Sequence, residues 1–266
     1  MGYGTYIMTL IGQRALVGGA TQGIGLACAQ RLAVEGCTVT VMARRAEAVE
    51  AAIDTLDRSC DQDHGGIVAD FTDWGATAQA AESHQPEGGW SILVHNAGGP
   101  PPGPLVEVDP NDLEAAMHPH LLLGQALVQL VRPSMRDAGF GRIVNIVSTS
   151  VVMPIKGLGV SNAVRGAIGN WSRTLAAELG PEGITVNNVL PGFTDTGRLA
   201  SLFQRRGEAS GRTAQEVADA IVAGIPVGRL ATPQETAALV AFLCRDEAGS
   251  INGASIPVDG GRLAAQ

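Results

Sequence analysis

Short apolar runs recur along the whole chain, and stretches with helical spacing separate them. The runs do not alternate between apolar and polar residues, which is typical of strands covered on both faces of a sheet. They occupy residues 15–17, 38–43, 66–69, 91–95, 142–148, 184–190 and 254–258. Helices are expected between them at 24–35, 46–57, 73–83, 111–138, 158–180 and 233–244. Because strand and helix alternate, the pattern predicts an α/β fold of Rossmann type, a doubly wound parallel sheet of about seven strands with helices on both faces.

No linker or internal repeat divides the chain, so residues 1–266 are predicted to form a single domain. The last helix has a clear start signal, with Thr232 as N-cap, Pro233 in the first turn and Glu235 completing a capping box. The alternation of strand and helix breaks at residues 197–225, which carry several arginines. This segment should lie beside the carboxyl ends of the strands, where ligands bind in such sheets. We interpret it either as a substrate lid or as an ordinary helical insertion.

Composition narrows the function classes. The chain has 18 basic and 26 acidic residues, a formal net charge of −8, and no basic cluster, which argues against a nucleic-acid partner. No apolar run is long enough to cross a bilayer, and the first residues lack a secretory signal, so the sequence predicts a cytoplasmic protein without a membrane partner. The cysteines are scattered without CxxC spacing, which predicts neither a metal site nor a disulfide framework.

A glycine-rich turn follows the first predicted strand. Gly19, Gly23 and Gly25 stand on a GxxxGxG spacing, with Thr21, Gln22 and Ile24 between them. Such a turn needs positive φ angles and brings backbone close to a diphosphate, which the next helix meets with its N-terminal amides. The chain contains no Gly-Lys pair, which excludes the phosphate loop of nucleotide triphosphatases. The turn therefore predicts a dinucleotide-binding domain.

The end of the second strand bears on the choice of cofactor. An acidic residue there binds the free 2′-hydroxyl of NAD, whereas arginine accommodates the 2′-phosphate of NADP. The sequence has Arg44 and Arg45 at this position and no acid before Glu47. This favours NADP(H) over NAD(H), and the alternative is that both arginines are solvated loop residues.

Together with the glycine turn, four further motifs resemble the short-chain dehydrogenase/reductase family, and the match runs from about residue 10 to 262. The resemblance implies an adenine contact at Asp70 and Phe71, a cofactor-bordering NAG motif, a segment around the nicotinamide, and a C-terminal region used for tetramer packing. In this sequence the NAG motif is Asn96, Ala97 and Gly98. The segment around the nicotinamide contains Pro191, Gly192, Thr194 and Thr196. We therefore expect a homo-tetramer or homo-dimer.

The family's catalytic tetrad of Asn, Ser, Tyr and Lys is altered. The serine position is held by Ser148, but the YxxxK positions hold Ser161 and Arg165, and the Asn position holds His120. The only tyrosines in the chain are Tyr3 and Tyr6, ahead of the first strand, and the only lysine is Lys156. The family mechanism in its usual form is therefore excluded.

The remaining groups suggest a different division of roles. Ser148 is expected to polarise the substrate oxygen, and Arg165 to hold the nicotinamide ribose as a permanent cation. His120 has an unperturbed pKa near neutrality, about 6.5, and is a candidate acid–base group. The alternative is that it is a polar filler beside Pro119, which should kink its helix. The other histidines are expected to have surface or structural roles.

The sequence thus predicts an NADP(H)-dependent oxidoreductase acting on a carbonyl or alcohol of a small molecule through a non-standard active site. Two alternatives remain open. One is a non-redox enzyme built on the same scaffold, and the other is an inactive subunit that binds or senses NADP(H).

Overall fold

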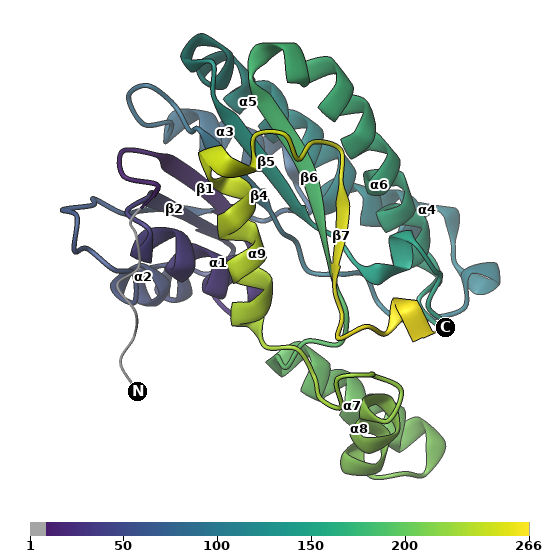
Figure 1. The fold of residues 1–266 in the computed structure, drawn as a ribbon. Coiled ribbons are helices and arrows are strands. Elements are labelled where there is room, and N and C mark those ends of the chain that lie inside the picture. Colours follow the sequence, from purple (N-terminus) through teal and green to yellow (C-terminus); the bar gives the residue numbers. More distant parts are fainter. Residues whose placement is uncertain (1–8, 266) are drawn as a thin grey trace.

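The computed structural model describes residues 9–265, so Tyr3 and Tyr6 lie outside the described residues. Within that range the chain forms a seven-stranded sheet in the order β3-β2-β1-β4-β5-β6-β7, and every pairing is parallel. The strands are β1 (Arg14–Gly18), β2 (Thr38–Ala43), β3 (Gly65–Val68), β4 (Ile92–His95), β5 (Gly141–Ile146), β6 (Ile184–Pro191) and β7 (Ser255–Val258). Figure 1 shows the sheet and its twist. The doubly wound fold predicted from the apolar runs is confirmed.

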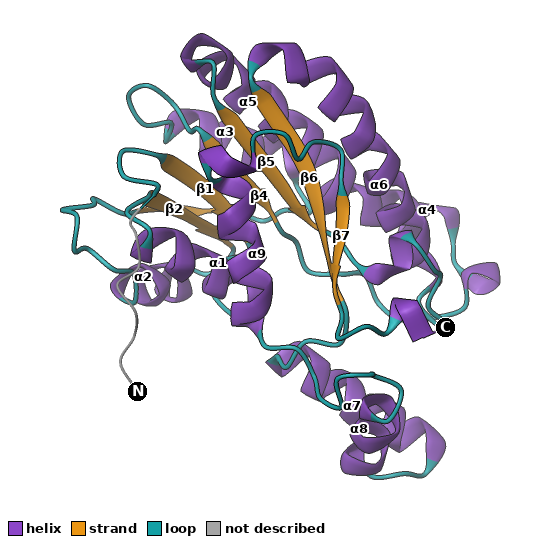
Figure 2. Cartoon of the chain, in the orientation of Figure 1, coloured by secondary structure: helices purple, strands orange, loops and turns teal. Residues whose placement is uncertain are grey.

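Helices cover both faces of the sheet, as Figure 2 shows. One layer contains α1 (Gly23–Val34), α2 (Ala46–Asp54) and α9 (Pro233–Cys244), and the other contains α3 (Trp74–Ser83), α5 (Leu123–Ala138) and α6 (Gly159–Leu179). Each layer packs on its own apolar core, with Leu32 and Val240 in the first and Leu127 and Leu175 in the second. Since both faces are buried, strands such as β6 are buried along their whole length, which explains their unbroken apolar character.

The direction of winding reverses between β1 and β4, which lie side by side. In a sheet of this type the reversal opens a crevice outside the carboxyl ends of the strands, where ligands bind. The glycine-rich turn after β1 and the Asn96–Gly98 motif after β4 both lie at this crevice.

The helix expected at 111–138 is divided into two. Helix α4 (Pro110–Met117) passes into a π-helical turn at His118–Leu122 before α5 begins. Pro119 has no N–H to donate, and its ring would clash in a regular α-helix, so the turn widens until Leu123 N–H reaches His118 O. A local π-turn therefore replaces the simple kink that the sequence suggested.

Two further boundaries differ from the prediction. Strand β5 ends at Ile146, so Ser148 lies beyond the strand, at the N-cap of a 3₁₀ turn formed by Thr149–Val151. Residues 197–225 form two helices, α7 (Gly197–Ser210) and α8 (Ala214–Val222), which Figure 1 shows standing apart from the sheet. They pack on a separate small core that includes Leu199, Phe203 and Val217, so this segment is built as a unit of its own.

The capping box at the start of α9 is present, with the Thr232 and Glu235 bonds both formed. Among residues 9–265, no helix combines the length and the apolar character needed to span a lipid bilayer.

Candidate functional site

The glycine turn is closely fitted to the loop after β4. Gly19 has a φ of 59°, and a Cβ atom there would fall 2.8 Å from Asn96 Nδ2. A Cβ atom at Gly25 would fall 2.2 Å from Gly19 O. Asn96 Nδ2 donates to Gly18 O at 3.1 Å and to Gly19 O at 3.4 Å, which fixes the shape of the turn. Only glycine fits at these positions because the backbone already occupies the space a side chain would need.

The turn leaves the start of α1 open to a ligand. Gln22 is the N-cap in an extended conformation, and its side chain makes no capping bond to the first amides of the helix. Thr196, at the start of α7, lies across the turn, since a Cβ atom on Gly23 would meet its methyl group at 3.3 Å. The glycines of the turn lie beside the first amides of α1, which the N-cap side chain does not bond, and Thr196 lies opposite them. Together they form a cradle that fits the diphosphate of a dinucleotide. Thr21 and Ile24 are half-buried in the same turn.

The expected adenosine end brings β2 and β3 together. Arg44 and Arg45 are both exposed after β2, and Arg45 is the N-cap of α2. Asp70 accepts hydrogen bonds from the Thr72 amide and hydroxyl at 3.0 and 2.9 Å. These bonds, with a smaller contribution from the Arg44 cation, lower the pKa of the Asp70 carboxyl. The cation and the carboxylate are therefore neighbours.

Phe71 is 8% exposed and belongs to the apolar core below the turn. Its ring supports Gly18, where a Cβ atom would lie 3.5 Å from it. Most of the Phe71 side chain is thus packed in the core. The ring edge and the Phe71 backbone are what remain for the predicted adenine contact.

The expected nicotinamide end is formed by the loops after β4 and β6. A Cβ atom on Gly192 would strike Asp259 Cβ at 2.7 Å, whereas one on Gly98 would have no neighbour within 4 Å. Gly98 therefore borders open space, while Ala97, Pro191 and Thr194 are buried beside it. Thr194 donates to Gly192 O at 3.5 Å, at the limit of a hydrogen bond.

Ser148, Ser161 and Arg165 come together where β5 meets α6. The Arg165 guanidinium donates to the Ser161 hydroxyl at 3.2 Å, to Ile146 O at 3.4 Å and to Val147 O. Val147 directly precedes Ser148, whose Oγ accepts from the Ser150 amide at 3.1 Å. The predicted group of three is thus one local cluster.

Arg165 is 8% exposed and has no acidic partner among the described residues. Burial, and then the Arg198 cation, lower its pKa to about 10, which leaves it protonated at neutral pH. A buried hydrogen-bond network of Asn145, Ser172 and Asn188 fastens the middle of α6 to the sheet and so fixes where Arg165 lies.

The prediction that His120 titrates near neutrality is wrong. Burial, followed by the cations of Arg165 and Arg198, lowers its pKa from 6.5 to about 3, so the imidazole is neutral. Its Nε2 atom is buried without a hydrogen-bond partner, and a backbone hydrogen bond joins the ring to Gly98. His120 therefore faces the cluster as a neutral polar group.

Two further residues contribute to the site, one of the histidines expected to be structural and one arginine of the 197–225 segment. His95, at the end of β4, contacts His120 O at 2.8 Å through Nε2 and so holds the π-turn in place. Arg198 packs on Gly99, where a Cβ atom would lie 2.4 Å from its guanidinium. Sequence reasoning gives Arg198 no role of its own in the site, although its place two residues after Thr196 is a signal that points to one.

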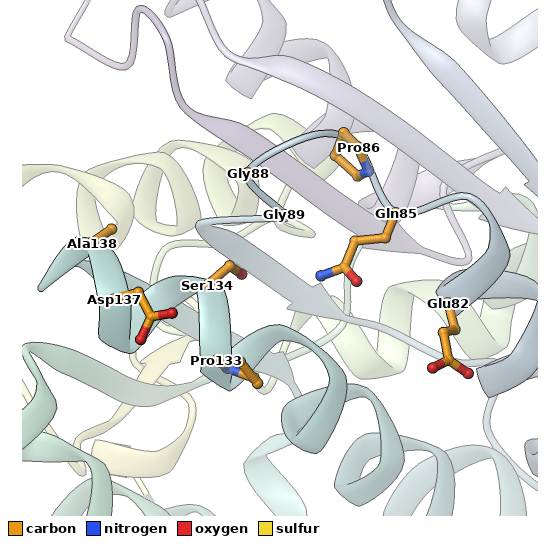
Figure 3. A pocket seen from close by; sticks show the side chains of 9 residues that line it. All are labelled: Glu82, Gln85, Pro86, Gly88, Gly89, Pro133, Ser134, Asp137 and Ala138. Atoms are coloured by element: carbon orange, nitrogen blue, oxygen red, sulfur yellow. The ribbon is translucent and has the colours of Figure 1, made fainter.

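A separate hollow lies between the loop before β4 and the end of α5 (Figure 3). It is lined by Glu82, Gln85, Pro86, Gly88, Gly89, Pro133, Ser134, Asp137 and Ala138. These segments are at the amino ends of the strands, so the hollow is not part of the candidate site.

Comparison with known proteins identifies relatives along nearly the whole chain. Residues 19–262 match the model of a family described as enoyl-(acyl carrier protein) reductase. The short-chain reductase protein NovJ of Streptomyces niveus is 36% identical over 93% of each chain. The 3-oxoacyl-(acyl-carrier-protein) reductase FabG of Pseudomonas aeruginosa is 33% identical over 96% of this chain and 98% of its own. The structure of L-sorbose reductase from Gluconobacter frateurii with NADPH and L-sorbose superposes with a TM-score of 0.89 at 27% identity, covering 97% and 98% of the two chains.

Proposed function

The chain belongs to the short-chain dehydrogenase/reductase family, and from that premise we propose that it is an NADPH-dependent carbonyl reductase whose oxyanion is stabilised by Arg165 and Ser148. The relatives named above are reductases, and a structural relative binds NADPH. The active site proposed for this chain differs from the usual one, because Ser161 and Arg165 stand at the Tyr and Lys positions.

One observation supports the proposal, namely a buried cation without a counter-charge that is hydrogen-bonded to the backbone directly before Ser148. A buried arginine normally has an acidic partner, because the cost of burying an unpaired charge is high. Arg165 instead has backbone carbonyls and a serine hydroxyl as partners. An unpaired cation of this kind can stabilise a negative charge that develops on the substrate during the reaction.

The proposed steps follow from this arrangement. The glycine turn after β1 and the loops after β4 and β6 would hold NADPH, which when bound would supply the hydride for the substrate carbonyl carbon. Ser148 donates its hydroxyl to the substrate oxygen, and the Arg165 guanidinium stabilises the charge that develops there. Ser161 keeps the guanidinium in position through its hydrogen bond. Because Arg165 stays protonated, the proton that completes the alcohol comes from water.

His120 is assigned a positioning role in place of acid–base catalysis. The neutral imidazole has at Nε2 a buried nitrogen without a hydrogen-bond partner among the described residues. Protonating the ring is disfavoured by the Arg165 and Arg198 cations. The imidazole therefore provides a fixed acceptor near the oxyanion site.

The preference for NADPH rests on Arg44 and Arg45. Both guanidinium groups are exposed beside the expected adenosine ribose, where a 2′-phosphate would meet two cations. Arg44→Asp should therefore weaken NADPH binding and leave NADH binding largely unchanged, as measured by calorimetric titration.

The test of catalysis follows NADPH absorbance with a panel of ketones, diketones and quinones, comparing the native protein with Arg165→Met and Ser148→Ala. Removing one oxyanion donor typically lowers kcat about 10²- to 10³-fold, and we expect a loss of that order for Arg165→Met. Arg173→Met is the matched control, because Arg173 is an exposed residue of the same helix. Binding of NADPH without turnover of any substrate would contradict the proposal and favour an NADP(H)-sensing subunit.

A second variant distinguishes these outcomes. The double substitution S161Y/R165K restores the family's Tyr and Lys pair. If the native protein is inactive and this variant turns substrate over, the chain is a binding protein on a reductase scaffold. If the native protein is active and Arg165→Met is unaffected, the assigned role of the arginine is wrong.

A further inference from the structure

A groove of about 470 Å³ lies between helix α7 and the loop that joins β5 to α6. It is lined by Pro102, Lys156, Gly157, Leu202, Arg205, Arg206 and Ala209. The lining combines three cations with apolar side chains, and no carboxylate is part of it. None of the sequence motifs that predict cofactor binding falls in this groove.

The sequence of α7 accounts for its contribution. Leu202, Arg205 and Ala209 follow at intervals of three and four residues, so they share one face of the helix. Leu199 and Phe203 are buried in the small core between α7 and α8. That core anchors one face of α7, and Leu202 at its edge packs partly against the core while it lines the groove.

The charges in the groove have no counter-charge in the part of the chain that the structure describes. Lys156, Arg205 and Arg206 form no ion pair with any carboxylate of residues 9–265. The chain as a whole has a net charge of −8, so a surface with cations alone runs against its composition. Like charges gathered in this way repel one another, and an anion that binds there relieves the repulsion.

Two segments that line the groove also lead to the proposed reaction centre. The loop that contains Lys156 follows Ser148, and Gly157 O accepts a hydrogen bond from Gly103 N at 2.8 Å. On the helix side, Arg205 lies close enough to Arg198 to lower its pKa, behind the larger effect of burial. Arg198 in turn acts on Arg165. The groove therefore belongs to the same helix and the same loop that border the centre.

We propose that Lys156, Arg205 and Arg206 form a subsite for an anionic group, a phosphate or a carboxylate, at the end of the substrate remote from its carbonyl. This inference rests on the proposed reductase function. Leu202 and Pro102 hold the apolar part of the same molecule between the anion and the reaction centre. The lid thus selects the substrate by charge, whereas the centre acts on its carbonyl.

The test measures binding without turnover, so that it is independent of catalytic activity. Octyl phosphate, octanoate and 1-octanol are titrated calorimetrically into the protein at low salt with saturating NADP⁺, which occupies the cofactor's own phosphate sites. The native protein is compared with the triple variant K156Q/R205Q/R206Q. The matched control is R58Q/R136Q/R173Q, which removes three exposed cations elsewhere and gives the same net charge.

We expect octyl phosphate, octanoate or both to bind the native protein and the control equally, and the groove variant at least about ten-fold more weakly. A preference for one probe identifies the anion as phosphate or carboxylate. The affinity of the groove variant should also depend less on salt, because fewer charges meet the anion. Binding of neither anion, an equal loss in the control variant, or unchanged binding in the groove variant would overturn the proposal.

Discussion

The substitution Gly98→Ala tests cofactor binding without disturbing the stability of the fold. Gly98 follows the Asn96 motif, has no φ in the left-handed region, and would place an added Cβ with no protein atom within 4 Å. The free protein should therefore accept the methyl group without strain. If a dinucleotide lies against this backbone, the methyl group meets the ligand instead.

The size of the effect follows from contact distances. A ligand atom in van der Waals contact with the Gly98 backbone stands about 3.5–4.0 Å from it, so a Cβ atom between them forces the ligand outward by about 1 Å. Overpacking by one methylene or methyl group costs about 1–3 kcal/mol. At about 1.4 kcal/mol for each factor of ten, the Kd for NADPH should rise about 5- to 150-fold.

The assay is a calorimetric titration with NADPH alongside thermal unfolding of the free protein. Gly166→Ala is the control, since Gly166 is an exposed residue of α6 and a Cβ atom there also meets nothing within 4 Å. It should leave the Kd unchanged and raise stability by about 0.5–1 kcal/mol, the helix preference of alanine over glycine. Gly25→Ala should lower the Tm because its Cβ atom would fall 2.2 Å from Gly19 O. Unchanged NADPH affinity in Gly98→Ala would refute the assigned position of the cofactor.

Two further predictions concern stability. Glu35 is fully buried and ion-paired to Arg31 at 2.9 Å and to Arg245 at 2.7 Å. Because both guanidinium groups are partly exposed, Glu35→Gln should lower the free energy of unfolding by about 2–3 kcal/mol, which is below the usual range for a broken buried pair. Urea unfolding measures this loss. Burial raises the pKa of the Glu35 carboxyl, but hydrogen bonds from Arg245 and Arg31 outweigh burial and lower the pKa overall. The stabilisation by Glu35 is therefore present above the pKa of the unfolded chain and is lost as the pH falls through the pKa of the folded protein. A Glu35→Gln variant that loses no more stability at neutral pH than in strong acid would contradict this. His120 has a folded pKa of about 3 against 6.5, so the unfolded chain binds more protons between these values and stability falls as the pH decreases through that window. Replacing His120 with Gln should remove about 2 kcal/mol of the loss between pH 7.5 and pH 5, and identical pH profiles of unfolding free energy would show that the imidazole is not held neutral.

Local patterns determined most of the fold. The apolar runs predict strands because a strand covered on both faces has no polar side to alternate with. The boundaries of α9 agree with the prediction, since its capping box acts through residues three apart. The glycine turn was also readable, because positive φ and close backbone approach leave glycine as the residue that fits.

The sequence alone also predicts an altered active site. With its tyrosines confined to Tyr3 and Tyr6 and its single lysine at Lys156, the chain has Ser161 and Arg165 where the resemblance places the family pair. That prediction needs no coordinates, because it depends on which residues are present and on their spacing from Ser148.

What the tertiary structure decided depends on contacts between distant segments. The neutrality of His120 arises from burial and from cations on α6 and α7, which no local pattern brings beside it. The π-turn follows from Pro119, but the hydrogen bond that holds it comes from His95 on β4, 25 residues away. The groove likewise joins Pro102, Lys156 and Arg205 from three separate segments. A pKa and a binding surface are set by neighbours in space, and the chain defines those neighbours only when the sheet and its helices are assembled.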